Sequence, residues 1–506
     1  MAAEDTAKTE ELVRSARELR QMLLRDPHRP TYHFVVPEGF ARPFDPNGCL
    51  YWKGMYHMFY IFQDSSLPSG GHCWGHASSV DLIHWRHHPT ALAPAPGDPD
   101  VGIFSGNAFV NKDGVPTIAY LGVGAGICIA TSDDDDLDHW TKCPANPVIP
   151  IPKEGDPGYG QYNVHDPHLW LERDTYYVIL NGRGLPKREY DTTYLFRSED
   201  LVHWEYRHPF YQPNPEWTGP EEDCACPDFF PLGDRYALLA ISHARGTRCY
   251  LGRYENETFW PEKHQRMNWP GGTCFAPESL LDGQGRRIFW AWVMDCRDHD
   301  AARASGWSGV MSLPRVLSLD ADGRLAIEPA EELHSLRRNH RRREGIELAA
   351  DAELPLDDMR GDRLELVVEI EPCDAREVGV VVRRSPDGAE QTPVAYDVNA
   401  KLLRIDLSKS SLDRRVKHRT FCCATGENPE VQAQQAPLEL APGEPLRLRI
   451  FLDGSIMEVF ANGRQCVTQR IYPTRGDSAG VRLFARGGRA LASSVEAWDL
   501  AAANSA

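Results

Sequence analysis

The sequence of 506 residues has no uninterrupted apolar run near the ~20 residues that a membrane-spanning helix needs. It is also short of positive charge, because 55 Lys and Arg residues stand against 73 Asp and Glu residues and leave a formal net charge of -18. Nucleic acids and anionic membranes are bound by net basic surfaces. The sequence therefore excludes both as partners.

The first 25 residues lack the apolar core of a signal peptide. Acidic and basic side chains are mixed there instead, and Leu12, Val13, Leu19 and Leu23 recur near helical spacing. We expect an amphipathic helix on a protein that is not exported and is cytoplasmic. The oligomeric state stays open, with a homo-oligomer as one alternative.

The cysteines lack the C-x-x-C spacing typical of zinc sites, because Cys224 and Cys226 are separated by one residue and Cys422 and Cys423 are adjacent. We predict no metal site and expect the 13 cysteines to be reduced thiols. Hydrophobic residues at 42% and charged residues at 25% are close to globular averages, which favours two packed domains.

A motif of the form Asp-Leu-x-His-Trp occurs at 81–85, 136–140 and 200–204, each time after a β-rich run. Its tryptophans are 55 and 64 residues apart, and Trp260 follows 56 residues later. Self-similarity at this period, with several short strands per unit, predicts a β-propeller of four-stranded blades. We expect the repeated tryptophans to pack blade against blade rather than to bind a ligand.

A second series of polar residues runs ahead of the first, with gaps of 60, 61, 62 and 50 residues. Its members are Asp45, Ser105, Asp166, Asp228 and Glu278. Each one alone is more typical of a turn, where Asp caps local amides. The recurrence predicts five blades whose inner strands carry these side chains into one pocket of the central channel.

We therefore predict an all-β chain with four parts. Residues 1–29 form a helical extension, 30–325 a five-bladed propeller, 326–347 a linker that includes a solvated basic run, and 348–506 an antiparallel β-sandwich. The sandwich carries no carboxylate or histidine cluster, and we interpret it as a packing or sugar-contacting module.

The predicted pocket holds several carboxylates, and the sequence has no glycine loop of the kind that binds phosphate. Glycoside cleavage needs one carboxylate as nucleophile or base and a second carboxyl group as proton donor. The pattern thus favours a glycosidase acting on a small oligosaccharide.

Several motifs resemble glycoside hydrolase family 32, the invertases, levanases and inulinases. They are Pro43-Phe44-Asp45-Pro46-Asn47-Gly48, Tyr60-Ile61-Phe62-Gln63, Trp74-Gly75-His76-Ala77, Phe104-Ser105-Gly106, Asp166-Pro167, Cys226-Pro227-Asp228, Phe275-Ala276-Pro277, Leu313-Pro314-Arg315 and Ile450–Phe460. The resemblance covers nearly everything from His33 to Pro473, in the same order.

The resemblance implies a retaining double displacement on a β-fructofuranosyl unit, without a cofactor. Asp45 matches the nucleophile, and Asp166 matches the carboxylate that holds the fructose hydroxyls and stabilises the transition state. The other residues predicted to bind substrate are Asn47, Gln63, Trp74, Phe104, Ser105, His165, Glu222 and Asp228.

The sequence departs from the family at three positions. The glutamate that serves as acid/base is replaced by Ala225, the arginine before Asp-Pro by His165, and the amide or lysine after Ala-Pro by Glu278. Alanine cannot donate a proton, so the acid must lie elsewhere. His165 suggests a substrate whose hydroxyl pattern or linkage differs from that of sucrose.

Residues two apart in a strand share a face, so Asp223 should point the same way as Ala225, and Glu222 the opposite way unless a bulge intervenes. A carboxyl group close to Asp45 and Asp166 would have its pKa raised, as a proton donor requires. Asp223 is the first candidate for the acid/base, Glu278 the second and Glu222 the third. Alternatively, this acidic run is a solvated loop.

The leading hypothesis is a β-fructofuranosidase-like enzyme with a relocated acid. A second is a glycosidase of altered furanoside specificity, or one with an inverting mechanism. A third is a sugar-binding protein without turnover.

Overall fold

The computed structural model describes residues 2–36, 41–64, 66–67, 71–181, 192–219, 222–420 and 428–503. Within these ranges the regular structure is mostly β. The predicted thiols Cys422 and Cys423 lie outside the described residues, and the eleven described cysteines are free.

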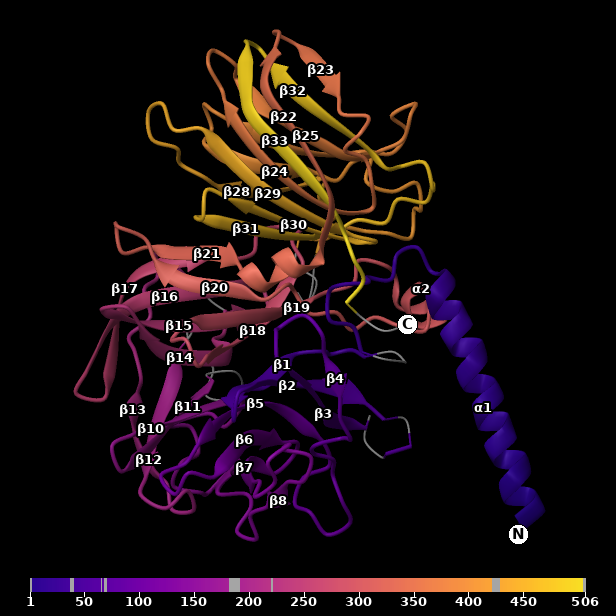
Figure 1. Ribbon diagram of the computed structural model, residues 1–506. Coiled ribbons are helices and arrows are strands. Elements are labelled where there is room, and N and C mark those ends of the chain that lie inside the picture. Colours follow the sequence, from indigo (N-terminus) through magenta and orange to yellow (C-terminus); the bar gives the residue numbers. More distant parts are fainter. Residues whose placement is uncertain are drawn as a thin grey trace.

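Five antiparallel sheets make up the first part of the chain (Figure 1). The first contains β1 (Pro46–Trp52), β2 (Met55–Gln63), β3 (His72–Ser79) and β4 (Arg86–His87). The second contains β5 (Ile103–Val110), β6 (Pro116–Gly122), β7 (Gly126–Thr131) and β8 (Thr141–Lys142), with β9 (Ile149–Pro150) paired to β7. The third contains β10 (Pro167–Glu172), β11 (Thr175–Asn181), β12 (Thr193–Ser198) and β13 (Glu205–Pro209). The fourth contains β14 (Ala225–Leu232), β15 (Arg235–Ser242), β16 (Gly246–Glu255) and β17 (Thr258–Arg266). The fifth contains β18 (Cys274–Leu281), β19 (Arg287–Val293), β20 (Arg315–Leu319) and β21 (Leu325–Pro329).

The first strands of these five sheets lie next to one another in a ring. β1 contacts β5 and β18, β5 contacts β10, β10 contacts β14, and β14 contacts β18. Residues just before or early in these strands therefore meet near one axis, although they come from distant parts of the chain.

Strands such as β2 are buried on both faces, which explains their nearly continuous aromatic and β-branched sequence. Trp85, Trp140 and Trp204 pack in apolar clusters between neighbouring sheets, as predicted, whereas Trp260 is exposed. In each repeat the backbone of the leucine has a left-handed conformation, with φ of 65° at Leu82, 58° at Leu137 and 67° at Leu201.

The second part of the chain is formed by two six-stranded antiparallel sheets around a shared apolar core. One contains β22 (Arg337–Leu348), β33 (Ala490–Leu500), β24 (Arg363–Glu371), β29 (Leu446–Asp453), β30 (Ile456–Ala461) and β31 (Gln465–Arg470). The other contains β23 (Ala352–Pro355), β32 (Gly480–Arg486), β25 (Glu377–Arg384), β26 (Thr392–Asp397), β27 (Leu402–Asp406) and β28 (Ala433–Pro437).

The predicted linker is not a linker in the structure. It contains most of β21, the 3-10 helix η1 (Glu331–Leu336) and nearly all of β22. The basic run forms an edge strand because its arginines find acidic partners on neighbouring strands. Arg337 pairs with Glu365 on β24, and Arg341 pairs with Asp499 on β33.

The two parts are joined by buried polar contacts around Asp453. Its carboxylate accepts hydrogen bonds from the backbone amides of Thr31, Tyr32 and His33, and His33 Nδ1 lies 3.0 Å from Asp453 Oδ2. His33 Nε2 lies 3.6 Å from the buried carboxylate of Glu458. These contacts tie the start of the first part to strands β29 and β30.

We expect Asp453→Asn to lower the free energy of unfolding by roughly 3 to 5 kcal/mol, because it breaks a buried charge pair and replaces an acceptor by a donor. Calorimetry or urea denaturation of the intact chain measures this. Asp322→Asn, at an exposed pair with Arg324, serves as the control and should change stability by less than about 1 kcal/mol. Equal losses in both variants would contradict the role of Asp453.

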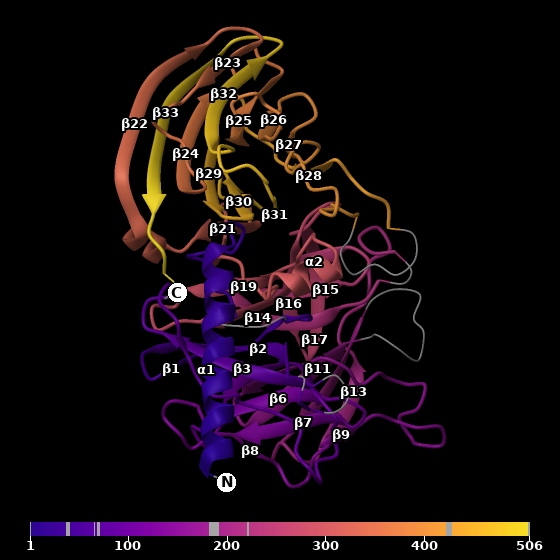
Figure 2. The same ribbon diagram turned by 90° about the vertical axis from the view of Figure 1, so that its right-hand side faces the viewer.

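The amino-terminal helix α1 (Ala2–Arg25) extends away from the body, and its carboxy-terminal end lies near the short helix α2 (His299–Ala304) (Figures 1 and 2). Only its last turns pack, with Leu23 buried and Leu19 beside it, whereas Leu12 and Leu24 are exposed. In the part of the chain that the structure describes, neither helix is long and apolar enough to cross a membrane.

Candidate active site

Three polar side chains from three neighbouring sheets meet around Cys226. Asp45 and Asp166 each place a carboxylate oxygen 3.8 Å from Cys226 Sγ, and Ser105 Oγ lies 3.7 Å from it. Ser105 also donates a hydrogen bond of 3.2 Å to Asp45. The sequence predicts Asp45, Ser105 and Asp166 in one pocket, and the structure brings these three together.

The backbone explains why the three carboxylate and hydroxyl groups converge. Asp45 directly precedes β1, Ser105 lies in β5 and Asp166 directly precedes β10, so each stands at the same end of a first strand. Cys226 completes the group from β14, where a register shift and a φ of 45° mark a bulge. Bulges redirect side chains, and this one turns the thiol toward the carboxylates.

Asp45 is buried. Its burial is the main cause, and the nearby charge of Asp166 the second, that raises its pKa to about 7. Its Oδ1 has no hydrogen-bond partner among the described residues. A carboxylate oxygen without donors keeps its lone pairs free for bond formation with an electrophilic carbon.

Asp166 has the opposite character. Burial would raise its pKa, but the charge and hydrogen bond of His165, with the amide of Cys226, hold the pKa well below its usual range. His165 Nδ1 lies 2.9 Å away, and Asn181 donates a hydrogen bond of 3.1 Å. Asp166 therefore stays ionised, while Asp45 titrates near neutral pH.

Four further predicted substrate contacts serve to hold this group together. Asn47 accepts from the amide of Gly106 and donates to the carbonyl of Asp45. Gln63 accepts from the amide of Arg42 and donates to Pro43, just before Asp45. Trp74 is fully buried and donates to the carbonyl of Phe104, whose ring stacks on His72. These hydrogen bonds hold neighbouring backbone segments in place around Asp45 and Ser105.

Asp223 and Glu222, the first and third candidates for the acid, have different partners. Asp223 accepts from the backbone amide of His243 at 2.9 Å and faces its Nδ1 at 2.7 Å. Glu222 is buried in ion pairs with Arg245 and Arg248. Burial opposes the ionisation of Glu222, but the charges of Arg248 and Arg245 and the hydrogen bonds from Arg248 and the Gly219 amide together lower its pKa. Glu221, the first residue of this acidic run, lies outside the described residues.

Asp228 and Glu278 lie farther along the first strands than Asp45. Left-handed residues at register shifts mark equivalent points in three strands: Gly48 (53°), Cys226 (45°) and Ala276 (48°). Asp45 precedes this point by three residues, whereas Asp228 and Glu278 follow it by two. The series of regularly spaced polar residues therefore contains residues at two different positions along the first strands.

The two deeper carboxyl groups line a separate pocket of about 450 Å³ together with His168 and Arg287. Burial and the charge of Asp228 raise the pKa of Glu278 well above its usual range, and burial raises that of Asp228 to about 6. The prediction that all five polar residues share one pocket is thus wrong for these two, because the bulges shift them past the group around Cys226.

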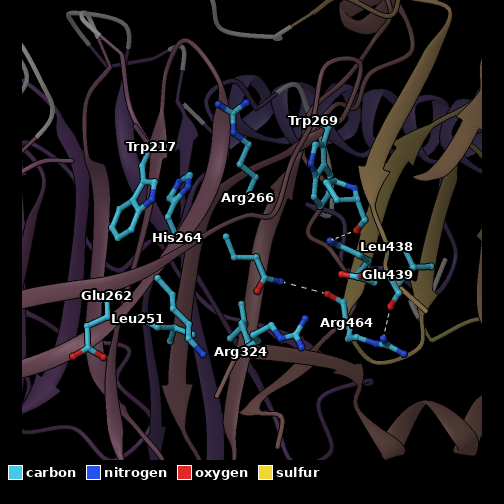
Figure 3. A pocket seen from close by; sticks show the side chains of 15 residues that line it. Trp217, Leu251, Glu262, His264, Arg266, Trp269, Arg324, Leu438, Glu439 and Arg464 are labelled. Atoms are coloured by element: carbon cyan, nitrogen blue, oxygen red, sulfur yellow. Dashed lines mark hydrogen bonds between the residues drawn. The ribbon is translucent and has the colours of Figure 1, made fainter. Parts of the chain in front are cut away.

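Another pocket, of about 670 Å³, lies between β17 and the loops and strands of the second part, and is lined by Trp217, His264, Arg266 and Arg464 (Figure 3). The rings of Trp217 and His264 stack 5.8 Å apart. Its lining contains neither Asp45 nor Asp166.

One group of metal-type ligands occurs among the described residues, at His76, His88 and Asp138. The imidazoles of His76 and His88 stack at 4.1 Å and 25°, and His88 pairs with Asp138 at 2.6 Å. Nitrogen lone pairs lie in the ring planes, so nearly parallel rings are poorly arranged to share an ion. We interpret the group as an ion pair that links the first two sheets.

Sequence reasoning missed two residues near this site, Asn181 and His243, and named Cys226 only as part of a motif. The hairpin register could have identified Asn181, because β10 and β11 pair without a shift and place Asn181 opposite Asp166. His243 could not be identified in this way, since the bulge at Cys226 changes the register of its hairpin.

Family models, known sequences and solved structures match this chain over most of its length. The glycosyl hydrolases family 32 N-terminal domain matches residues 33–329, and the family 32 C-terminal domain matches residues 332–499. A sucrose-6-phosphate hydrolase of Zymomonas mobilis is 30% identical over 95% of this chain and 94% of its own length. A levanase of Bacillus subtilis is 30% identical over 91% of this chain and 68% of its own length. The structure of fructan 1-exohydrolase IIa from Cichorium intybus superposes with a TM-score of 0.80 at 24% identity, over 94% of this chain and 98% of its own.

The fold and these matches define the protein as a glycosidase of the kind that acts on fructosides. The chain belongs to glycosyl hydrolase family 32, and its class is that of the β-fructofuranosidase-like hydrolases.

Proposed function

We propose that the protein hydrolyses a small β-fructofuranoside with retention of configuration, and that its five amino-terminal sheets are the blades of a five-bladed propeller around the site. One observation carries the proposal. Asp45 from the first sheet and Asp166 from the third reach the same thiol, one with a pKa near neutrality and the other held ionised.

In this mechanism Asp45 attacks the anomeric carbon of the fructosyl unit and forms a covalent intermediate, which water then hydrolyses. Asp166 holds fructose hydroxyls and stabilises the positive charge that develops in the transition state. Ala225 cannot supply the proton, and the sequence names Asp223 first, Glu278 second and Glu222 third for that role.

The names of the relatives guide the choice of substrate. They describe hydrolysis of sucrose 6-phosphate, levan and fructan, all of which present a terminal fructosyl unit. His165, beside Asp166, stands where the family resemblance predicts arginine, so we expect the preferred fructoside to differ from sucrose in linkage or in the group attached.

A hydrolysis panel tests the proposal with sucrose, sucrose 6-phosphate, inulo-oligosaccharides and levan-oligosaccharides. We expect fructose release from at least one, and proton NMR at early times should show the β-anomer of fructofuranose first. Release of the α-anomer first would indicate inversion. Saturable sugar binding without release of fructose from any substrate would overturn the proposal in favour of a sugar-binding protein.

A further inference from the structure

Asp223 and His243 form a pair just beyond the ends of β14 and β15, next to Ala225 at the start of β14. Ala225 on β14 lies opposite Ile241 on β15. Two residues farther out, Asp223 lies opposite His243 and uses one carboxylate oxygen for its backbone amide and the other for its Nδ1. The pair therefore continues the pairing of β14 with β15 and stands two residues from the position of the missing glutamate.

The pair also lies beside the two reacting carboxyl groups. Cys226, adjacent to Ala225, contacts both Asp45 and Asp166, and the charge of His243 acts on both of these carboxyl groups. The imidazole packs edge-on against Phe275 of the fifth sheet, with ring centroids 5.8 Å apart. About 31% of the His243 side chain is exposed, so a bound substrate can reach it.

Two Asp–His pairs formed within turns provide a contrast. His84 pairs with Asp81 and His203 with Asp200, each three residues apart within a turn on the outer part of a sheet. Both histidines are more than half exposed. Asp223 and His243 are instead 20 residues apart, at the open end of the hairpin of β14 and β15, and Asp223 is buried. A local turn motif therefore does not account for it.

We propose that His243 is the catalytic acid and base of this enzyme and that Asp223 is the residue that positions it. This rests on the proposed function and corrects the simpler assignment of Asp223 as the acid. Asp223 fixes the proton of Nδ1, so Nε2 is the nitrogen that exchanges a proton with substrate. Imidazole exchanges protons near neutral pH, which suits this role.

The chemistry then runs in two steps. Asp45 Oδ1 bonds to the anomeric carbon while the bond to the leaving oxygen breaks, and that oxygen takes the proton from His243 Nε2. Water next attacks the anomeric carbon, its proton passes to Nε2 and the bond to Asp45 breaks. Fructose leaves, and His243 is protonated again.

The test compares His243→Ala with His203→Ala as the matched control. On sucrose or the preferred fructoside, we expect His243→Ala to lower kcat by about 10² to 10⁴ and His203→Ala to leave it unchanged. On 4-nitrophenyl β-fructofuranoside, whose leaving group needs no proton, His243→Ala should release a rapid burst of nitrophenol followed by slow turnover. Azide should speed that slow phase, because it attacks the intermediate without a base.

Asp223→Asn separates positioning from folding. We expect kcat to fall by about 10- to 10²-fold with little change in KM, because the imidazole loses the partner that orients it but substrate still binds. A loss carried by KM, with kcat unchanged, would overturn the positioning role. Equal loss of His243→Ala activity on both substrates, without azide rescue, would overturn the acid role. Release of the α-anomer of fructofuranose first by the unmodified enzyme would instead contradict the covalent intermediate of the proposed function.

Discussion

Asp45→Asn is expected to abolish turnover, with a loss of about 10⁵-fold or more in kcat, because removal of a nucleophile leaves only binding and the surrounding charges to act on the substrate. Asn is close in size to Asp, so it should fit the same space beside Ser105 and Cys226. Substrate should still bind, which isothermal titration calorimetry can measure. Single-turnover mixing with 4-nitrophenyl β-fructofuranoside should show no burst.

We also expect Asp45→Asn to change the stability of the protein. The Asp45 carboxyl group keeps its proton up to a pKa of about 7 in the folded protein, against 3.8 for an ordinary Asp. The folded state therefore binds more protons between these two pH values, and stability falls as the pH rises through this window. Asp45→Asn removes the buried charge, so above pH 7 it should raise the free energy of unfolding by at most roughly 4 kcal/mol.

Below about pH 4 the stabilisation should vanish, because Asp45 is then protonated in both states. Thermal denaturation at several pH values measures the difference. Ser105→Ala is the matched control, since it removes a neighbour of Asp45 and leaves the carboxyl group in place. Asp45→Asn with near-normal turnover, or a stability gain that does not depend on pH, would contradict the role and the environment assigned to Asp45.

Asp166→Asn is expected to lower kcat/KM by about 10³-fold, because it removes the negative charge that faces the developing positive charge of the fructosyl unit. It should also shift the pH dependence. The charge of Asp166 contributes to the raised pKa of Asp45, so its removal should move the acidic limb of kcat/KM to lower pH.

A pH profile of kcat/KM from about pH 4 to 9 measures both effects. Activity of the unmodified enzyme should rise with pH as Asp45 loses its proton near 7. His165→Gln serves as the comparison because it keeps the carboxylate. A large rate loss with an unmoved acidic limb would show that Asp166 does not act on Asp45.

The recurrence of polar residues was enough to identify the central group from the sequence. Asp45, Ser105 and Asp166 all lie at the same ends of first strands, so a regular period in the sequence becomes proximity in space. The order of the motifs along the chain likewise indicates the family. These features depend on residue types and spacing along the chain, which the sequence contains in full.

Other features depended on details that spacing does not encode. The basic run beginning at Arg337 is a strand because acidic partners on β24 and β33 are folded beside it. Glu278 belongs to a deeper pocket because a bulge at Ala276 precedes it. In both cases residues from distant strands determine the outcome.

The sequence by itself determined the family, the pair Asp45 and Asp166, and the absence of an acid at Ala225. Only the tertiary structure decided which group stands beside that position. Counted from the turn between β14 and β15, regular pairing would place Ala244 opposite Asp223. The bulge at Cys226 adds one residue to β14, shifts the register by one and brings His243 there instead.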